Sequence, residues 1–249
     1  RRRAIVRWLE PFPVRVKTVP NLADLAAGRA QLEDIRDVEI EDLLGRDPVE
    51  PDQALLRACI DGKNVLVTGA GGSIGSELCR QIAMLSPRRL VLYELSEYAL
   101  YQIERELREM LARTGKELEL VPVLGSVLNR ARMQELMRAF EIQTVYHAAA
   151  YKHVPLVEHN VLEGVRNNTL GTWHAAMAAQ TAGVETFVLI STDKAVRPTN
   201  VMGASKRMAE LVLQGLAEEG GKTLFCMVRF GNVLGSSGSV VPLFREQIR

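Results

Sequence analysis

Apolar and polar positions follow two alternating patterns from residue 64 onward. Short runs that are apolar throughout alternate with longer segments in which apolar residues recur every three or four positions. The runs predict six strands, at residues 65–68, 90–94, 118–123, 144–148, 186–190 and 224–230. The periodic segments predict a helix ending near 85, a long helical region ending near 183, and helices at 96–114, 129–140 and 201–219.

This alternation is typical of a doubly wound α/β fold. Strands that are apolar on both faces belong in a parallel sheet that helices cover on each side. We therefore predict a dinucleotide-binding sheet domain over residues 61–249, preceded by a small N-terminal preamble at 1–60. Residues 241–249 predict a helix that has just begun. We expect the chain to be a piece of a longer protein whose C-terminal substrate region is truncated.

Composition excludes a disordered, collagen-like or coiled-coil chain, and the net charge does not argue for a nucleic-acid-binding protein. Of the 249 residues, 47% are apolar and 24% are charged, which is close to the average of soluble globular proteins. The formal net charge of +1 gives no reason to expect nucleic acid. Neither the three cysteines nor His147, His153 and His159 have metal-ligand spacing, so no metal is expected. The basic residues within 1–19 fit the cytoplasmic flank of a transmembrane helix or a solvated tail.

A glycine-rich turn follows the first predicted strand and precedes the next helix. Gly69, Gly72 and Gly75 are spaced three apart in this turn. Glycine lets the backbone approach a diphosphate closely, and a helix N-terminus offers N–H groups to the anion. Glu94 ends the second strand, where a carboxylate would bind ribose hydroxyls and repel a 2′-phosphate. The pattern predicts a site for NAD rather than NADP; a structural turn without a ligand is the alternative.

Several motifs, in order along the chain, resemble the extended short-chain dehydrogenase/reductase superfamily. They are the Thr-Gly-x-x-Gly-x-x-Gly turn and the segments 147–150, 168–172, 191–194, 202–206 and 229–233. The strings STDKAVRPTNVMGASKR and VRFGNVLGSSGSVVPLF resemble the membrane-anchored UDP-N-acetylglucosamine 4,6-dehydratases of polysaccharide biosynthesis. Residues 35–46 resemble the linker that follows the membrane helices in that family.

The resemblance implies a function and a location. It implies an NAD-dependent lyase that converts a UDP-N-acetylhexosamine, UDP-N-acetylglucosamine, to a 4-keto-6-deoxy sugar nucleotide. It also implies a homo-oligomer on the cytoplasmic side of the inner membrane, attached through a segment outside this sequence. A sugar-nucleotide 4-epimerase or reductase on the same fold is one alternative, and an inactive NAD-binding interaction module is another.

The same resemblance implies catalytic roles for five residues. Thr192 would bind the C4 hydroxyl, Asp193 would be the acid for the C6 hydroxyl, and Lys194 would be the base for the C5 proton. Adjacent Asp and Lys could equally form an ordinary ion pair. Lys206 would hold the nicotinamide ribose. Met202 stands where the superfamily usually has tyrosine, so the group that takes the O4 proton is open, with Lys206 acting through Thr192 or a water as one candidate.

Further contacts are implied for the cofactor and the sugar nucleotide. The expected cofactor contacts are Gly69, Gly72, Ser73, Ile74, Gly75, Glu94, Ser126, Val127, Ala148, Ala149 and Lys206. The expected substrate contacts are Lys152, His153, Asn232 and Ser237. A surface or flexible loop is the alternative interpretation of the segments that carry these four residues.

Overall fold

The computed structural model describes residues 2–9, 11–14, 16–19, 35–37, 49, 51–231 and 233 of the chain. The chain divides into two compact units, Arg1–Pro51 and Asp52–Arg249. Asp52 caps helix α4 (Gln53–Ala58) by accepting hydrogen bonds from the first backbone N–H groups of the helix. This division lies before α4, whereas the sequence pattern suggested a boundary after residue 60.

The first unit contains a short helix and a pair of short strands. Helix α1 spans Arg2–Leu9, and the rings of Trp8 and Phe12 lie 5.8 Å apart. Strands β1 (Lys17–Thr18) and β2 (Arg36–Asp37) pair antiparallel. Most of the segment 35–46 that resembles a family linker lies outside the described residues. In the described part of the chain, no helix is both long and apolar enough to cross a membrane.

The second unit is built on a parallel sheet of six strands, in the order β5-β4-β3-β6-β7-β8. The strand order reverses between β3 and β6, and in such sheets ligands bind beyond the carboxyl ends of the strands at this point. The predicted doubly wound fold is confirmed. The strands are β3 (Asn64–Thr68), β4 (Arg89–Glu94), β5 (Glu119–Leu124), β6 (Thr144–His147), β7 (Thr186–Thr192) and β8 (Leu224–Phe230).

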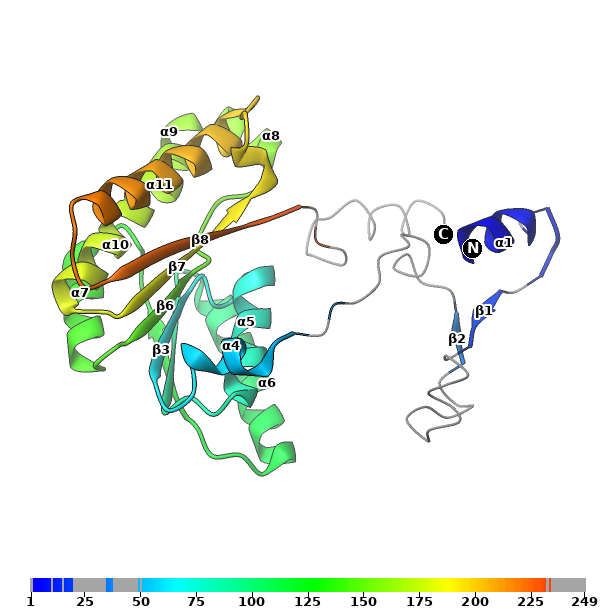
Figure 1. Ribbon diagram of the computed structural model, residues 1–249, viewed down its shortest axis with the longest axis horizontal. Helices are drawn as coiled ribbons and strands as arrows, with labels where there is room; N and C mark the ends of the chain where they lie inside the picture. The colour runs from blue at the N-terminus through cyan, green and yellow to red at the C-terminus, as the bar shows by residue number, and fades with distance from the viewer. Residues whose placement is uncertain are drawn as a thin grey trace. The chain divides into compact units, whose positions relative to one another are not determined.

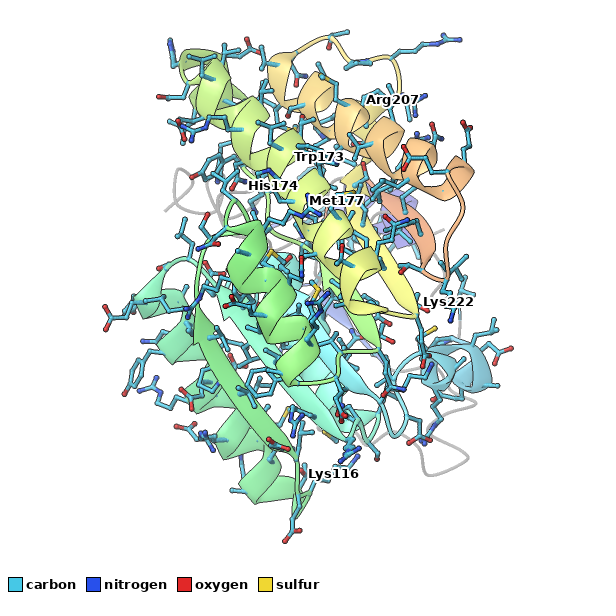
Figure 2. All side chains as sticks on the ribbon, turned by 90° about the vertical axis from the view of Figure 1, so that its left-hand side faces the viewer. Lys116, Trp173, His174, Met177, Arg207 and Lys222 are labelled. Carbon is cyan, nitrogen blue, oxygen red and sulfur yellow. The ribbon has the colours of Figure 1, made fainter. Side chains whose placement is uncertain are left out.

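Helices cover the sheet on both faces, which explains why the central strand β3 is buried along its whole length. Val65 and Val67 of β3 pack in a core cluster with residues of α5 and α6, whereas Leu66 packs on the opposite side with residues of α7, α10 and α11. Figure 1 shows the helical layers on the two faces of the sheet. Figure 2 is seen from the side of α7, α10 and α11, with Trp173, His174 and Met177 labelled on α10. The helices are α5 (Ser73–Met84), α6 (Glu97–Thr114), α7 (Arg130–Ala139), α10 (Gly171–Ala182) and α11 (Val201–Glu218).

The long helical region predicted up to residue 183 is divided in the structure. It consists of α8 (Val154–His159), α9 (Val161–Val165), the π-helix η2 (Arg166–Leu170) and α10. A π-helical turn widens the helix, and such turns are frequent at functional sites. The wide turn carries Asn168, whose side chain is fully buried. Helical periodicity alone could not reveal this change of winding. The helix predicted at 241–249 lies outside the described residues.

Candidate active site

The glycine-rich turn between β3 and α5 is shaped by close backbone contacts. Gly69 has a φ of +66°, and a Cβ atom there would lie 2.8 Å from the backbone of Ala149. A Cβ atom on Gly75 would lie 1.9 Å from the carbonyl oxygen of Gly69. Gly72 is the N-cap of α5, and it gives the helix no side-chain cap. The first turn of α5, which begins at Ser73 and Ile74, therefore receives no side-chain cap from Gly72, as in helices whose N-terminus binds an anion.

The Glu94 carboxylate is fixed at the end of β4 by backbone donors. Its Oε2 accepts a hydrogen bond from the Gly71 N–H at 3.0 Å. Its Oε1 accepts from the N–H groups of Leu95 and Ser96, at 2.9 and 3.0 Å. Gly71 is a part of the site that the sequence analysis missed: a Cβ atom there would lie 2.5 Å from the Cβ of Ala99. The only signal was the extra glycine in the turn.

His147 closes β6 at the reversal point of the sheet, and its tautomer follows from its partners. The Thr172 hydroxyl donates its one proton to the Asn168 carbonyl at 2.7 Å, so it accepts from His147 Nε2–H at 3.2 Å. His147 Nδ1 then accepts from the Thr68 hydroxyl at 2.8 Å. Burial lowers the pKa of His147 to about 3, and the charge of Lys206 lowers it as well. His147 is a neutral link between β3, β6 and α10.

The other residues expected at the cofactor lie near the ends of β5 and β6. The Ser126 carbonyl accepts from the Tyr93 hydroxyl at 2.9 Å. Val127 is buried, and a Cβ atom on Gly171 would lie 2.8 Å from its side chain. Ala148 N–H donates to the carbonyl of β3's last residue at 3.1 Å. These residues share one edge of the sheet with the glycine-rich turn, while their contacts with a cofactor stay predictions.

The three residues Thr192, Asp193 and Lys194 form a small cluster at the end of β7. Asp193 begins the short 3-10 helix η3 (Asp193–Ala195). Its Oδ1 accepts from Lys194 Nζ at 3.1 Å and from the Thr192 hydroxyl at 3.0 Å. The hydrogen bond from Lys194 is the main cause that holds the pKa of Asp193 below its usual value. The ion pair considered from the sequence is present, and its catalytic role stays a prediction.

Lys206 and Met202 lie one turn apart on α11, and both are buried. Lys206 is 4% exposed, and its Nζ donates to the carbonyl of Ile190 in β7 at 2.7 Å. Burial lowers the pKa of Lys206 to about 8, while the Glu210 carboxylate acts in the opposite direction. Met202 is also 4% exposed. Its thioether has no proton to exchange, so it cannot replace the phenol that the superfamily usually has there.

Asn168 is a second site residue whose role the sequence did not reveal. Its side-chain amide accepts from Tyr151 N–H at 2.8 Å and donates to the Tyr151 carbonyl at 3.0 Å. It also donates to the Ser205 hydroxyl at 3.0 Å. The π-helix η2 therefore ties the segment after β6 to α11. The motif 168–172 was recognised, but nothing in it pointed to this contact.

The residues expected at the substrate are only partly described. Lys152 Nζ donates to Ser73 Oγ at 3.3 Å, which places this lysine beside the N-terminus of α5. His153 is the N-cap residue of α8. Asn232 and Ser237 lie outside the described residues. Within the described ranges, no group of three or more His, Cys, Asp and Glu side chains is arranged to hold a metal ion.

Comparisons with known proteins identify the family. A model of the family described as "Polysaccharide biosynthesis protein" matches residues 65–249. The chain belongs to this family. It is 51% identical over 235 residues to the capsular polysaccharide biosynthesis protein CapD of Staphylococcus aureus, covering 94% of this chain and 39% of CapD. The family resemblance seen in the motifs is therefore confirmed.

Other relatives differ in the reaction that their names give. The chain is 32% identical over 191 residues to a UDP-N-acetylglucosamine 4,6-dehydratase (inverting) of Campylobacter jejuni, covering 76% of the chain and 54% of that protein. It is also 32% identical over 189 residues to a UDP-glucose 4-epimerase of Rickettsia rickettsii, covering 75% and 54%. The chain thus spans about half or less of the length of these relatives, and it is similar to dehydratases and epimerases of sugar nucleotides.

Solved structures agree with the fold. Pen from Bacillus thuringiensis matches with a TM-score of 0.69 and 34% identity, over 76% of this chain and 58% of that one. A UDP-glucose-4-epimerase from Stenotrophomonas maltophila, solved with bound NAD and formylated UDP-arabinopyranose, matches with a TM-score of 0.59 and 24% identity, over 72% and 60%. The prediction of an NAD-binding fold is in agreement with these structures.

Proposed function

We propose that this chain carries the NAD-binding and reactive part of a UDP-N-acetylglucosamine 4,6-dehydratase. The product is a 4-keto-6-deoxy sugar nucleotide for polysaccharide or glycan synthesis. The observation that carries the proposal is the pairing of Asp193 and Lys194 at the end of β7. The pair supplies both groups that an elimination of water needs, whereas oxidation at C4 is common to dehydration and epimerisation.

The glycine-rich turn and Glu94 fit NAD. The cradle of Gly69 and Gly75 has no space for a Cβ atom, and the N-cap at Gly72 leaves the helix N-terminus to an anion. These residues would hold the diphosphate, with Glu94 on the adenosine ribose and Lys206 on the nicotinamide ribose. When bound, NAD supplies a hydride acceptor for C4 of the sugar and then a hydride donor for C6. NAD is therefore not consumed.

The residues at the end of β7 would move the protons of the reaction. The Thr192 hydroxyl would bind the C4 oxygen, and as C4 is oxidised the O4 proton would pass through Thr192 or a water to Lys206. Lys194 would remove the C5 proton, which the new ketone acidifies, and Asp193 would protonate the C6 oxygen so that water leaves. These steps require the ammonium proton of Lys194 to pass to the Asp193 carboxylate, which gives the neutral amine and the protonated carboxyl, whereas the ion pair favours the charged form of Asp193. We infer that the bound sugar separates the pair.

A 4-epimerase is the second candidate, since a relative at 32% identity carries that name. Epimerisation needs hydride transfer at C4 alone and leaves the mass of the sugar nucleotide unchanged. Lys194 as a C5 base and Asp193 as a C6 acid would then have no role in the reaction. Mass spectrometry of UDP-N-acetylglucosamine incubated with the protein and NAD detects the loss of water, and proton NMR of the same sample reports the configuration at C4. Loss of one water supports dehydration, a new C4 configuration without mass change supports epimerisation, and no reaction supports an inactive NAD-binding module.

Assembly and location belong to the same proposal. We expect a homo-oligomer attached to the cytoplasmic side of the inner membrane through a segment outside this sequence. The CapD relative, which takes part in capsule synthesis by name, supports a place near the cell surface. Cell fractionation of the natural protein and light scattering of the purified chain would test these two expectations separately.

A further inference from the structure

Glu210 on α11 is a fully buried carboxylate that the proposed reaction does not use. Its Oε1 accepts from the Ser191 hydroxyl at 2.6 Å and from Arg229 Nε at 2.8 Å. Its Oε2 accepts from Arg229 Nη2 at 2.6 Å and from Arg207 Nη1 at 2.9 Å. The side chain of Glu210 has no exposed surface, while about two fifths of each arginine side chain is exposed (39% and 37%).

The sheet register explains how these groups meet. Ser191 of β7 and Arg229 of β8 are direct partners in the parallel ladder, so their side chains lie on the same face of the sheet. That face is the one that α11 covers. The cluster therefore joins the carboxyl ends of β7 and β8 to one position on α11.

The same face of α11 contacts the end of β7 at two further positions. A Cβ atom on Gly203 would lie 2.4 Å from the Lys194 carbonyl oxygen, so the helix touches η3 closely. Lys206 donates to the Ile190 carbonyl, three residues further along the helix. Glu210 follows after four more residues. Positions 203, 206 and 210 share one helical face, so α11 is fixed along the whole reactive end of β7.

A buried ionic cluster is weak evidence for stability, because apolar side chains of similar volume often serve as well. Burial alone would raise the pKa of Glu210, yet the hydrogen bonds from Arg229, Ser191 and Arg207 together lower it to about 2. The carboxylate is therefore kept charged. A charged group with all its acceptor positions occupied fixes its donors in direction, which an apolar contact would not do.

We propose that Glu210 is a positioning residue that holds Ser191, and through it the adjacent Thr192 and Asp193, in the geometry that the reaction requires. The proposal rests on the proposed function of the β7 end. The carboxylate acts through the Ser191 hydroxyl, whose single proton can only be donated to it. Small displacements of a reactive group can lower a rate strongly without changing binding.

The test compares four single variants of this chain and one double variant. Ser191→Ala removes the hydroxyl that donates to Glu210 but leaves Arg207 and Arg229 paired with that carboxylate. Ser191→Thr keeps a hydroxyl at this position. Glu210→Gln removes the charge. Arg207→Met is the matched control, because Arg207, labelled on α11 in Figure 2, bonds to the same carboxylate without contacting Ser191. For each variant, kcat and KM are measured with UDP-N-acetylglucosamine, and the Kd of NAD is measured by calorimetry.

We expect kcat to fall while KM and the Kd of NAD stay nearly unchanged. Ser191→Ala should lower kcat about tenfold with KM and the Kd of NAD within about twofold, and Ser191→Thr should recover most of the loss. Arg207→Met should keep kcat within about twofold. The double variant of Ser191→Ala and Glu210→Gln should lose no more than Glu210→Gln alone. An unchanged kcat in Ser191→Ala, or an equal loss in Arg207→Met, would overturn the proposal.

A second measurement separates this proposal from the proposed function. If the wild-type chain converts no sugar nucleotide, amide hydrogen exchange across residues 191–195 is compared instead. Faster exchange there in Ser191→Ala, with wild-type exchange in Arg207→Met and in the β3 core, supports the positioning role. The same exchange in all of these proteins overturns it, whatever the reaction turns out to be.

Discussion

Around β3 and β4 the site is made of backbone, whereas around β7, α11 and β8 it is made of side chains. Gly69, Gly75 and the N–H of Gly71 define the first region, together with the Glu94 carboxylate that the Gly71 N–H binds. In the second region polar side chains bond to one another, as in the ion pair of Asp193 and Lys194 and in the cluster around Glu210. Under the proposed function, the first region would bind its ligand with little change, while the second would rearrange when its substrate binds.

The largest expected effect concerns this second region. Asp193→Asn and Lys194→Ala should each lower the rate of dehydration by about 10²–10⁴, the usual loss for a positioned acid or base. The Kd of NAD should change little, because the cofactor region does not depend on the pair. Steady-state rates and calorimetry check both parts. Turnover at the wild-type rate in either variant would remove that residue from the mechanism.

Lys206 links the two regions, and its neighbour Met202 gives the matched comparison. Lys206→Met removes the donor to Ile190 and the ammonium that would bind the nicotinamide ribose under the proposed function, so we expect at least about a hundredfold loss of rate and weaker NAD binding. Met202→Leu conserves volume and loses no proton, so the rate should stay within a few fold. Initial rates at saturating NAD and substrate measure the difference. Equal losses would give Met202 a role beyond packing.

The difference between the regions also explains what could be predicted from the sequence. Strand and helix alternation fixed the sheet, and the glycine spacing located the cofactor turn, because both depend on local backbone preferences. The contacts of Asn168 and Glu210 join elements far apart in the chain, and no local pattern encodes them. One hint was available, since a glutamate on the face of α11 that packs against the sheet needs a partner. The change of winding at η2 left no such signal.

The cofactor region is tested through Glu94. Glu94→Ala removes the carboxylate that would bind the ribose and repel a 2′-phosphate. We expect NAD to bind about tenfold more weakly and its advantage over NADP to narrow. Calorimetry with both dinucleotides measures this. Gly71→Ala is not a suitable control because its Cβ atom would collide with Ala99, so Glu97→Ala, an exposed residue in the first turn of α6, serves instead. Stronger binding of NADP than NAD to the unchanged chain would contradict our interpretation of Glu94.

The smallest effect lies between the two regions, at His147. Its pKa is about 3 in the folded chain and near 6.5 in an unfolded one, so between these values the unfolded state binds more protons. Proton binding by His147 in the unfolded state therefore lowers the free energy of unfolding as the pH falls below 6.5, by up to about 1.4 kcal/mol for each pH unit. Urea unfolding is measured between pH 6.5 and 5, above the pH at which most carboxylates such as Glu210 titrate, and the comparison with His147→Gln separates this histidine from the other three. His147→Gln should flatten the pH dependence in this window even if it lowers stability throughout. An unchanged slope would mean that His147 is protonated in the folded chain, and the neutral link between β3, β6 and α10 would then be wrong.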